Sequence, residues 1–142
     1  MERRKFIRSG CTFCLLGAAG MLLPMLESCG TTQKTAVYKT TVKDNKIEVP
    51  LSLFAQGTLQ FVRAKGQYYD IAVQQHEDNT YTALLLRCTH MDNQLNVTGN
   101  GYRCNQHGSE FDKDGNVKKG PAEHALKQYN VTIDNDKLVI TI

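Results

Sequence analysis

Two short segments of the chain each pair a cysteine with a histidine and could bind a metal. Residues 88–90 read Cys-Thr-His, and residues 104–107 read Cys-Asn-Gln-His. Thiolate and imidazole are side-chain groups that proteins use to bind zinc, copper and iron. The candidate ligands are therefore Cys88, His90, Cys104 and His107.

The second segment continues as Gly-Ser-Glu-Phe-Asp over residues 108–112. A C-x-H box followed by a C-x-x-H-G-S box with this tail resembles the Rieske family of iron–sulfur proteins. The resemblance implies one 2Fe-2S cluster, with Cys88 and Cys104 on one iron and His90 and His107 on the other. Two neutral imidazoles in place of two anionic thiolates make such a cluster less negative, so its reduction potential is higher.

A structural zinc site is the alternative for the same four side chains. Finger-like sites usually place two cysteines in one segment and two histidines in the other, whereas each segment here holds one of each. This mixture favours the iron–sulfur cluster. Zinc is silent in visible and electron paramagnetic resonance spectra and a reduced Rieske cluster is not, so spectra distinguish the two.

The resemblance also implies roles for residues around the ligands. Ser109 matches the family serine whose hydroxyl donates a hydrogen bond to a cluster sulfur, which stabilises the reduced state. Phe111 lies where high-potential members from cytochrome bc complexes have a tyrosine, so it packs but donates nothing. Gly120 and Pro121 resemble the family's proline loop, which covers the cluster and limits water. A simple turn is the alternative for this pair.

Cytochrome bc members carry two further cysteines, which join the two ligand loops by a disulfide. The matching positions here are Asn93 and Gln106. The other three cysteines all precede residue 30, so we expect no structural disulfide in the domain. His76 and His124 belong to neither box and are expected to be ordinary polar residues.

The first 28 residues are predicted to be an export signal. Arg3 and Arg4 are followed by Phe6, Ile7 and an apolar stretch, which resembles a twin-arginine signal. That route exports proteins already folded with their cofactor, which suits a cluster assembled in the cytoplasm. The apolar stretch, residues 11–26, is shorter than the about 20 residues that a membrane-spanning helix needs.

Residues 26–29, Leu-Glu-Ser-Cys, resemble a lipobox, whose cysteine is lipidated after cleavage. Cys29 would then anchor the protein, since lipid chains contribute about 0.8 kcal/mol per buried methylene. An uncleaved signal anchor is the alternative, and Glu27 is unusual for a lipobox. We therefore expect an export signal over residues 1–28, a lipidated tether over 29–36 and the Rieske domain over 37–142.

The charge balance argues against a nucleic-acid-binding role. The net charge of +3 comes mostly from the basic residues of the N-terminal segment. The rest of the sequence has no basic stripe with interleaved aromatic side chains. Its length suffices for one compact domain.

That domain is predicted to be all-β, with small stacked antiparallel sheets and two cluster-binding loops at one tip, as the Rieske resemblance implies. Short runs rich in β-branched, aromatic and leucine residues alternate with turn residues, and no stretch has a sustained helical period. A hairpin through residues 99–101 should join the ligand loops, and tight turns are expected at residues 44–45, 78–79 and 114–115. The expected strands span residues 38–42, 47–54, 59–63, 69–74, 81–86, 95–98, 102–103, 129–133 and 138–142.

The sequence thus favours an exported, membrane-anchored electron carrier on the periplasmic side or elsewhere in the cell envelope. It would pass single electrons between a donor, with quinol as a candidate, and a haem or oxidoreductase partner, without a separate catalytic site. The alternatives are a Rieske subunit of a quinol–cytochrome c oxidoreductase or of a molybdenum oxidase, and a zinc-stabilised structural lipoprotein. The absent disulfide and Phe111 count against a high-potential quinol-oxidising subunit.

Overall fold

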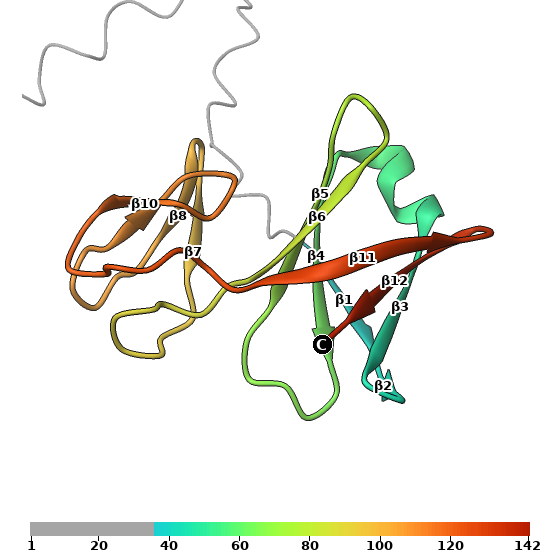
Figure 1. The fold of residues 1–142 in the computed structure, drawn as a ribbon, viewed down its shortest axis with the longest axis horizontal. Coiled ribbons are helices and arrows are strands. Elements are labelled where there is room, and N and C mark those ends of the chain that lie inside the picture. The colour runs from blue at the N-terminus through green and yellow to red at the C-terminus, as the bar shows by residue number, and fades with distance from the viewer. Residues whose placement is uncertain (1–35) are drawn as a thin grey trace, which may run out of the picture. The chain divides into compact units, whose positions relative to one another are not determined.

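Short strands and one 3-10 helix make up the part of the chain that the computed structural model describes, residues 36–142 (Figure 1). The all-β prediction is confirmed. The elements are β1 (Val37–Thr40), β2 (Val42–Lys43), β3 (Lys46–Pro50), η1 (Leu51–Gln56), β4 (Leu59–Ala64), β5 (Ile71–Gln75), β6 (Tyr81–Leu85), β7 (Asn96–Thr98), β8 (Gly101–Arg103), β9 (Glu110–Phe111), β10 (Val117–Lys119), β11 (Gln128–Asp134) and β12 (Lys137–Thr141).

The larger sheet has eight strands in the order β1-β4-β5-β6-β11-β12-β3-β2. Its neighbours pair antiparallel except β1 and β4, which run parallel. The sheet curls, so that β1 at one end of the order comes into contact with β3 near the other end. The strands of both halves therefore face one another across a shared interior.

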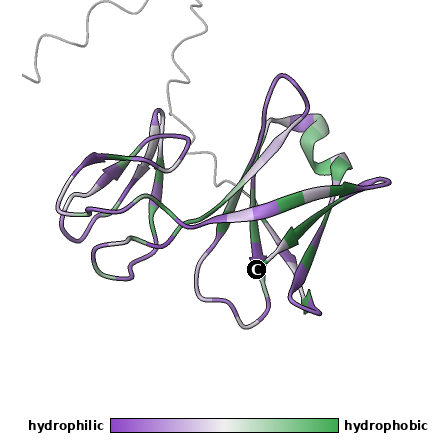
Figure 2. Ribbon diagram, in the orientation of Figure 1, coloured by the Kyte–Doolittle hydropathy of each residue, from purple (hydrophilic) through white to green (hydrophobic). Residues whose placement is uncertain are grey.

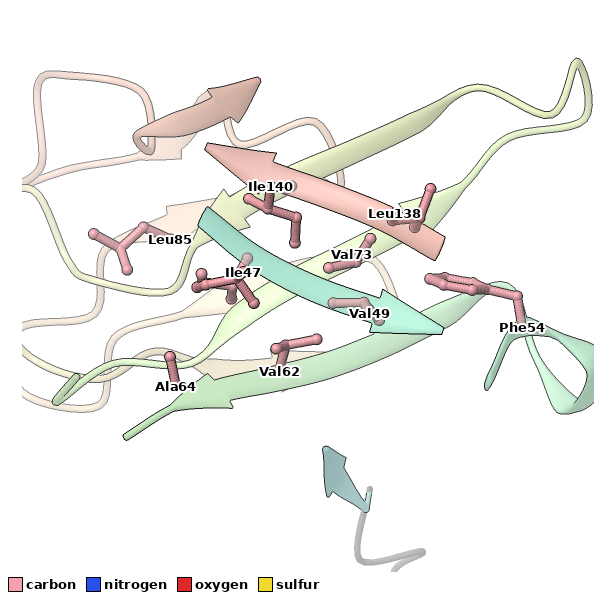
Figure 3. Packing of buried hydrophobic residues seen from close by; sticks show 11 residues of the cluster. Ile47, Val49, Phe54, Val62, Ala64, Val73, Leu85, Leu138 and Ile140 are labelled. Atoms are coloured by element: carbon pink, nitrogen blue, oxygen red, sulfur yellow. The ribbon is translucent and has the colours of Figure 1, made fainter. Parts of the chain in front are cut away.

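That interior is filled by alternating residues of the facing strands, as Figure 3 shows. In β3 and β12 every second side chain is buried, which is the period of a strand with one face toward the core. Phe54 of η1 closes one end of this core and packs edge-to-face on Tyr81. The core consists of Ile47, Val49, Phe54, Val62, Ala64, Ile71, Val73, Ala83, Leu85, Leu138 and Ile140.

The strand predicted over residues 47–54 ends at Pro50, where the chain enters η1. The φ of Pro50 is −63°, and the N–H of Leu51 donates to the carbonyl of Asp136 instead of extending the ladder. Because Leu51, Leu53 and Phe54 all turn toward the core, a 3-10 turn buries them better than strand alternation would. Figure 2 shows η1 as a hydrophobic segment, in contrast to the hydrophilic turn between β11 and β12. Within residues 36–142, no helix is long and apolar enough to cross a membrane.

Two of the predicted turns are confirmed, one by its backbone conformation and one by the strand pairing on either side of it. Asp44 and Asn45 have φ of 49° and 59° and join β2 to β3 by a two-residue turn of the kind that matches strand twist. Thr98 pairs with Gly101, so the expected hairpin turns through Gly99 and Asn100. Strands β9 and β10 were not predicted, because strands of two and three residues are too short to show an alternation of apolar and polar residues.

The smaller sheet, in the order β10-β9-β8-β7, is inserted between β6 and β11 of the larger sheet. These two strands are neighbours, and the N–H of Leu85 donates to the carbonyl of Lys127 (2.9 Å) where the insertion begins and ends. A second core joins the outer face of β4–β6 to the insertion. It consists of Phe61, Ala72, Leu84, Leu86, Cys88, Leu95, Tyr102, Cys104, Phe111, Ala122 and Leu126. The second half of β6, from Ala83 to Leu85, is thus buried on both faces, which explains its unbroken apolar run.

Candidate metal centre

The first ligand segment lies in a closed loop between β6 and β7. The N–H of Leu95 donates to the carbonyl of Leu86 (2.9 Å), so the loop begins as a continuation of the strand pair. Cys88 then donates its N–H to Asn93 (2.8 Å) and accepts the N–H of Asp92 (3.0 Å) at its carbonyl. Asp92 has a φ of 43°, which lets the chain reverse within these few residues.

The second ligand segment lies between β8 and β9 and repeats the same backbone pattern. Cys104 donates its N–H to Ser109 (2.9 Å) and accepts the N–H of Gly108 (3.0 Å) at its carbonyl. Gly108 has a φ of 78° and occupies the position of Asp92 in the first loop. The two cysteines therefore stand at equivalent points of two similarly closed loops.

The structure brings the candidate ligands together in two pairs, which differ in depth. Cys88 and Cys104 are almost fully buried in the second core. His90 and His107 are exposed, and their ring centroids lie 5.1 Å apart with the planes at 86°. The sulfur side of the site is thus packed inside the protein, while the imidazole side faces outward.

Polar groups around Cys88 favour the thiolate, the form of cysteine that binds metals. Burial of this thiol acts to raise its pKa, but the backbone N–H groups of His90 and Met91 outweigh burial, with help from the Cys104 and Ser109 side chains. The net effect is that the pKa of Cys88 is lowered. Such a sulfur can carry negative charge inside the core.

This donor set fits a two-iron cluster. A Rieske cluster takes two thiolates on one iron and two imidazoles on the other. The structure places the two candidate thiols together in the second core and the two candidate imidazoles together at the surface, which is the same division.

A third loop, between β10 and β11, is bound to both ligand loops. The buried hydroxyl of Ser109 accepts the N–H of Ala122 (3.1 Å), and the hydroxyl of Thr89 donates to the carbonyl of His124 (2.7 Å). Gly120 and Pro121 lie at the exposed start of this loop. With its oxygen accepting from Ala122, the Ser109 hydroxyl keeps its own hydrogen free for a sulfur acceptor.

Phe111 lies in the second core with both cysteines and is 1% exposed. It pairs with Tyr102 in β8 and with Val117 in β10, so it stands in the middle of the smaller sheet. A Cβ on Gly101 would come within 2.1 Å of the carbonyl oxygen of Phe111. The glycine at the start of β8 therefore permits the close strand approach behind the cysteines.

Polar contacts hold the first loop where bc-type members have a disulfide. Asn93, at one of the two matching positions, donates its amide to the carbonyl of Met91 (2.7 Å). Asp92 accepts Arg87 at its carboxylate (2.6 Å) and the Tyr69 hydroxyl at its carbonyl. The Arg87 guanidinium also lies over the Tyr69 ring, 5.9 Å from its centroid. Sequence analysis missed this network, because Tyr69 is distant in the chain and belongs to no motif.

The two remaining histidines lie outside the two ligand loops and make other contacts. The ring of His76 is hydrogen-bonded to the hydroxyl of Thr82 (2.6 Å) in the β5–β6 hairpin. His124 is exposed and contributes its backbone carbonyl to Thr89. They differ from His90 and His107 in where they lie in the fold, not in residue type.

A family model described as the Rieske [2Fe-2S] domain matches residues 36–130. The chain belongs to the Rieske family. Its cofactor is one Rieske-type 2Fe-2S cluster.

The relatives include iron-sulfur subunits of the cytochrome b6-f complex. The cytochrome b6-f complex iron-sulfur subunit of Synechococcus elongatus is 31% identical over 153 residues, which cover 99% of this chain and 84% of that subunit. Iron-sulfur subunit 1 of the cytochrome b6-f complex from Nostoc sp. is 34% identical over 79 residues, or 54% of this chain and 44% of that subunit. The match thus spans less than half of the Nostoc relative.

Among solved structures, the Rieske fold recurs in the plasma membrane Rieske protein PetC3 from Synechocystis PCC 6803. The TM-score is 0.57 at 21% identity, over 68% of this chain and 99% of that one. At this identity the likeness supports the fold alone.

Proposed function

We propose that Cys88 and Cys104 bind one iron of the cluster and that His90 and His107 bind the other. The observation that supports this assignment is the meeting of two buried thiols and two exposed imidazoles on loops with matching backbone hydrogen bonds. The cluster accepts and returns one electron when it is bound. The chain supplies a dry, N–H-lined sulfur side and an imidazole edge that a partner can approach.

The exposed imidazoles make His90 and His107 the proposed point of electron entry and exit. Each ring, bound to iron through one nitrogen, keeps its second nitrogen for a hydrogen bond to a donor or acceptor. With iron bound to the other nitrogen, this free nitrogen would also be the place where a proton could move to or from the partner, so electron and proton transfer at this edge would be coupled.

We further propose that the protein passes electrons from a quinol to a haem partner within a membrane complex. The names of the cytochrome b6-f relatives support a cytochrome complex as the setting. The small subunit of a molybdenum oxidase is the alternative. Phe111, which has no hydroxyl, and the polar loop contacts in place of a disulfide favour an intermediate reduction potential, which either setting could use.

The test is to extract the full chain from its native membranes in mild detergent and identify what co-purifies. A rhombic Rieske spectrum that a quinol reduces, together with a co-purifying haem protein that reoxidises the cluster, is the expected result. A molybdenum-containing subunit as the stable partner would replace the proposal with the alternative. A sample with zinc and no iron would overturn both.

Attachment to the membrane is proposed to depend on Cys29 after an export signal over residues 1–28 is removed; both lie outside the described residues. The Cys29→Ala variant should lose a lipid-sized mass and either leave the membrane fraction or accumulate as uncleaved precursor. Intact-mass spectrometry and fractionation measure this, with Cys14→Ala as the matched control that keeps both properties. An unchanged mass and unchanged membrane attachment in Cys29→Ala would contradict the lipobox and favour an uncleaved anchor.

The Ser109 hydroxyl is expected to raise the reduction potential of the cluster. Phe111 has no hydroxyl to donate, so the potential should stay below that of family members with a tyrosine at this position. Ser109→Ala removes a donor to sulfur and should lower the midpoint, whereas Phe111→Tyr adds one and should raise it. A hydrogen bond to a charged group is worth about 1.5–3 kcal/mol, so each shift should reach up to roughly 100 mV. Redox titration checks both, with the exposed Ser52→Ala as control. An unchanged midpoint in Ser109→Ala would show that other features set the potential.

A further inference from the structure

Four exposed lysines gather at one end of the edge strands of the larger sheet. They lie in β1, in β2, in β3 and directly after β4. Within residues 36–142, none of their ammonium groups makes a salt bridge. We call this set the lysine patch: Lys39, Lys43, Lys46 and Lys65.

Strand register places the cations of the patch directly beside one another. Lys43 and Lys46 are cross-strand partners in the β2–β3 hairpin. Lys39 is the partner of Arg63 in the β1–β4 pair, and only the arginine has a carboxylate, Asp70, at 2.6 Å. Like charges that face each other across a strand pair destabilise the sheet. The arrangement therefore costs stability that an anion outside the protein could return.

The surface between these strands is hollowed. One open hollow of about 460 Å³ is bordered by Lys43 and Lys46, with the carboxylates of Asp44 and Glu48 also in its lining. Another of about 420 Å³ is bordered by Lys39, Arg63 and Lys65, and its lining includes no carboxylate. Both hollows include Thr40 and Thr41, so they lie on the two sides of the link from β1 to β2. Hydroxyl and ammonium donors on a hollowed surface suit phosphate groups.

The positive charge of the patch is local. Residues 36–142 contain as many acidic as basic side chains, so the domain has no general excess of positive charge. The lysine at the other border of the first hollow, Lys137, is paired with Glu48 at 3.1 Å. Four of the lysines without a salt bridge in residues 36–142 thus lie where β1, β2 and the β4–β5 turn meet.

We propose that the lysine patch contacts the anionic phospholipid headgroups of the membrane to which the chain is tethered. This inference rests on the proposed anchoring at Cys29. From Cys29 to Val37 the chain can span at most about 28 Å, so β1 and the patch that follows it stay near the bilayer. The tether thus lets the patch approach the bilayer to within the roughly 8 Å over which electrostatic attraction acts at physiological salt.

The contact would also orient the cluster. Figure 1 shows the β2–β3 hairpin on the side of the larger sheet away from the smaller sheet, which carries the ligand loops. A domain that rests on the patch keeps His90 and His107 turned from the lipid. Electron exchange would then occur with a partner that extends beyond the membrane surface.

The test uses the full-length holoprotein in nanodiscs of phosphatidylcholine, with or without phosphatidylglycerol. Acylation of each lysine is followed by peptide mass spectrometry. The patch lysines should react several-fold more slowly in the anionic discs, and high salt should remove the protection. Lys118 and Lys119, on β10 of the smaller sheet, should react equally in both lipids.

Charge reversal within the patch supplies the matched comparison. Lys43→Glu with Lys46→Glu should abolish the lipid-dependent protection of Lys39 and Lys65, whereas Lys118→Glu with Lys119→Glu should leave it. Equal labelling of the wild-type patch in both lipids would overturn the proposal. Lysines on edge strands can also serve only to block strand pairing between copies; variants that dimerise, without any lipid dependence in the wild type, would assign them that role.

The same samples separate this inference from the proposed function. The electron paramagnetic resonance spectrum reports whether the cluster is present, and intact mass reports whether Cys29 carries lipid. A normal spectrum and lipidated protein with equal labelling would overturn the patch alone. A missing spectrum with salt-sensitive protection would overturn the ligand assignment and leave the patch in place.

Discussion

Replacing His107 by alanine is expected to abolish the rhombic Rieske spectrum and to leave a poorly stable apo-protein. The proposed cluster has two protein ligands on each iron, so loss of one imidazole leaves an iron held by a single side chain. Metal binding and folding share the same free energy, so the loops around the site should loosen with it. Iron content, the spectrum and hydrogen exchange measure the effect.

The matched control is His124→Ala, because this exposed histidine contributes only its backbone carbonyl to the site. It should keep a full spectrum. In His107→Ala, lost exchange protection should be confined to the insertion between β6 and β11, since the larger sheet has a core of its own. A His107→Ala protein with a normal rhombic signal would contradict the ligand assignment.

Replacing Gly101 by alanine is expected to disrupt the smaller sheet. The new Cβ would lie 2.1 Å from the carbonyl oxygen of Phe111, and this neighbour is backbone that cannot rotate away. The φ of Gly101 is also 146°, a conformation that other residues adopt only under strain. We expect a loss of at least ~3 kcal/mol in the free energy of unfolding and a fall in cluster content.

Denaturant unfolding and iron content test this prediction, and two other glycines separate its causes. Gly99→Ala should be nearly neutral, since nothing lies within 4 Å of its Cβ position. Gly66→Ala meets no atom within 4 Å either but has a φ of 86°, so it isolates the cost of backbone strain. If Gly101→Ala unfolds no more easily than Gly66→Ala, the strand contact is softer than the geometry indicates.

Local chemistry made parts of this molecule predictable from sequence. Asp44 and Asn45 tolerate positive φ, so their turn could be placed to the residue. The C-x-H and C-x-x-H segments identified His90 and His107 as candidate ligands, because this combination of residue types and spacing is rare. Both signals depend on residues that are neighbours in the chain.

The parts that escaped prediction depend on contacts between distant segments. The hydroxyl of Tyr69 meets the carbonyl of Asp92 only after β5, β6 and the first ligand loop have packed. The bend at Pro50 depends on the carbonyl of Asp136, which arrives from the other end of the domain. No local pattern encodes such partners.

The place of the smaller sheet in the chain has a consequence for how the protein folds. Because the strands that flank the insertion are hydrogen-bonded neighbours, the pairing of β6 with β11 holds Leu85 and Lys127 together at its two ends. Closing a free loop of roughly forty residues costs about 3 kcal/mol of chain entropy, and in this topology the pairing within the larger sheet offsets that cost without a contribution from the cluster. Without a cluster, the insertion is then a loop whose two ends are already fixed. Binding of the proposed cluster would require the two short ligand loops to close around it, and would not require four ligands to be brought together from distant parts of an unfolded chain.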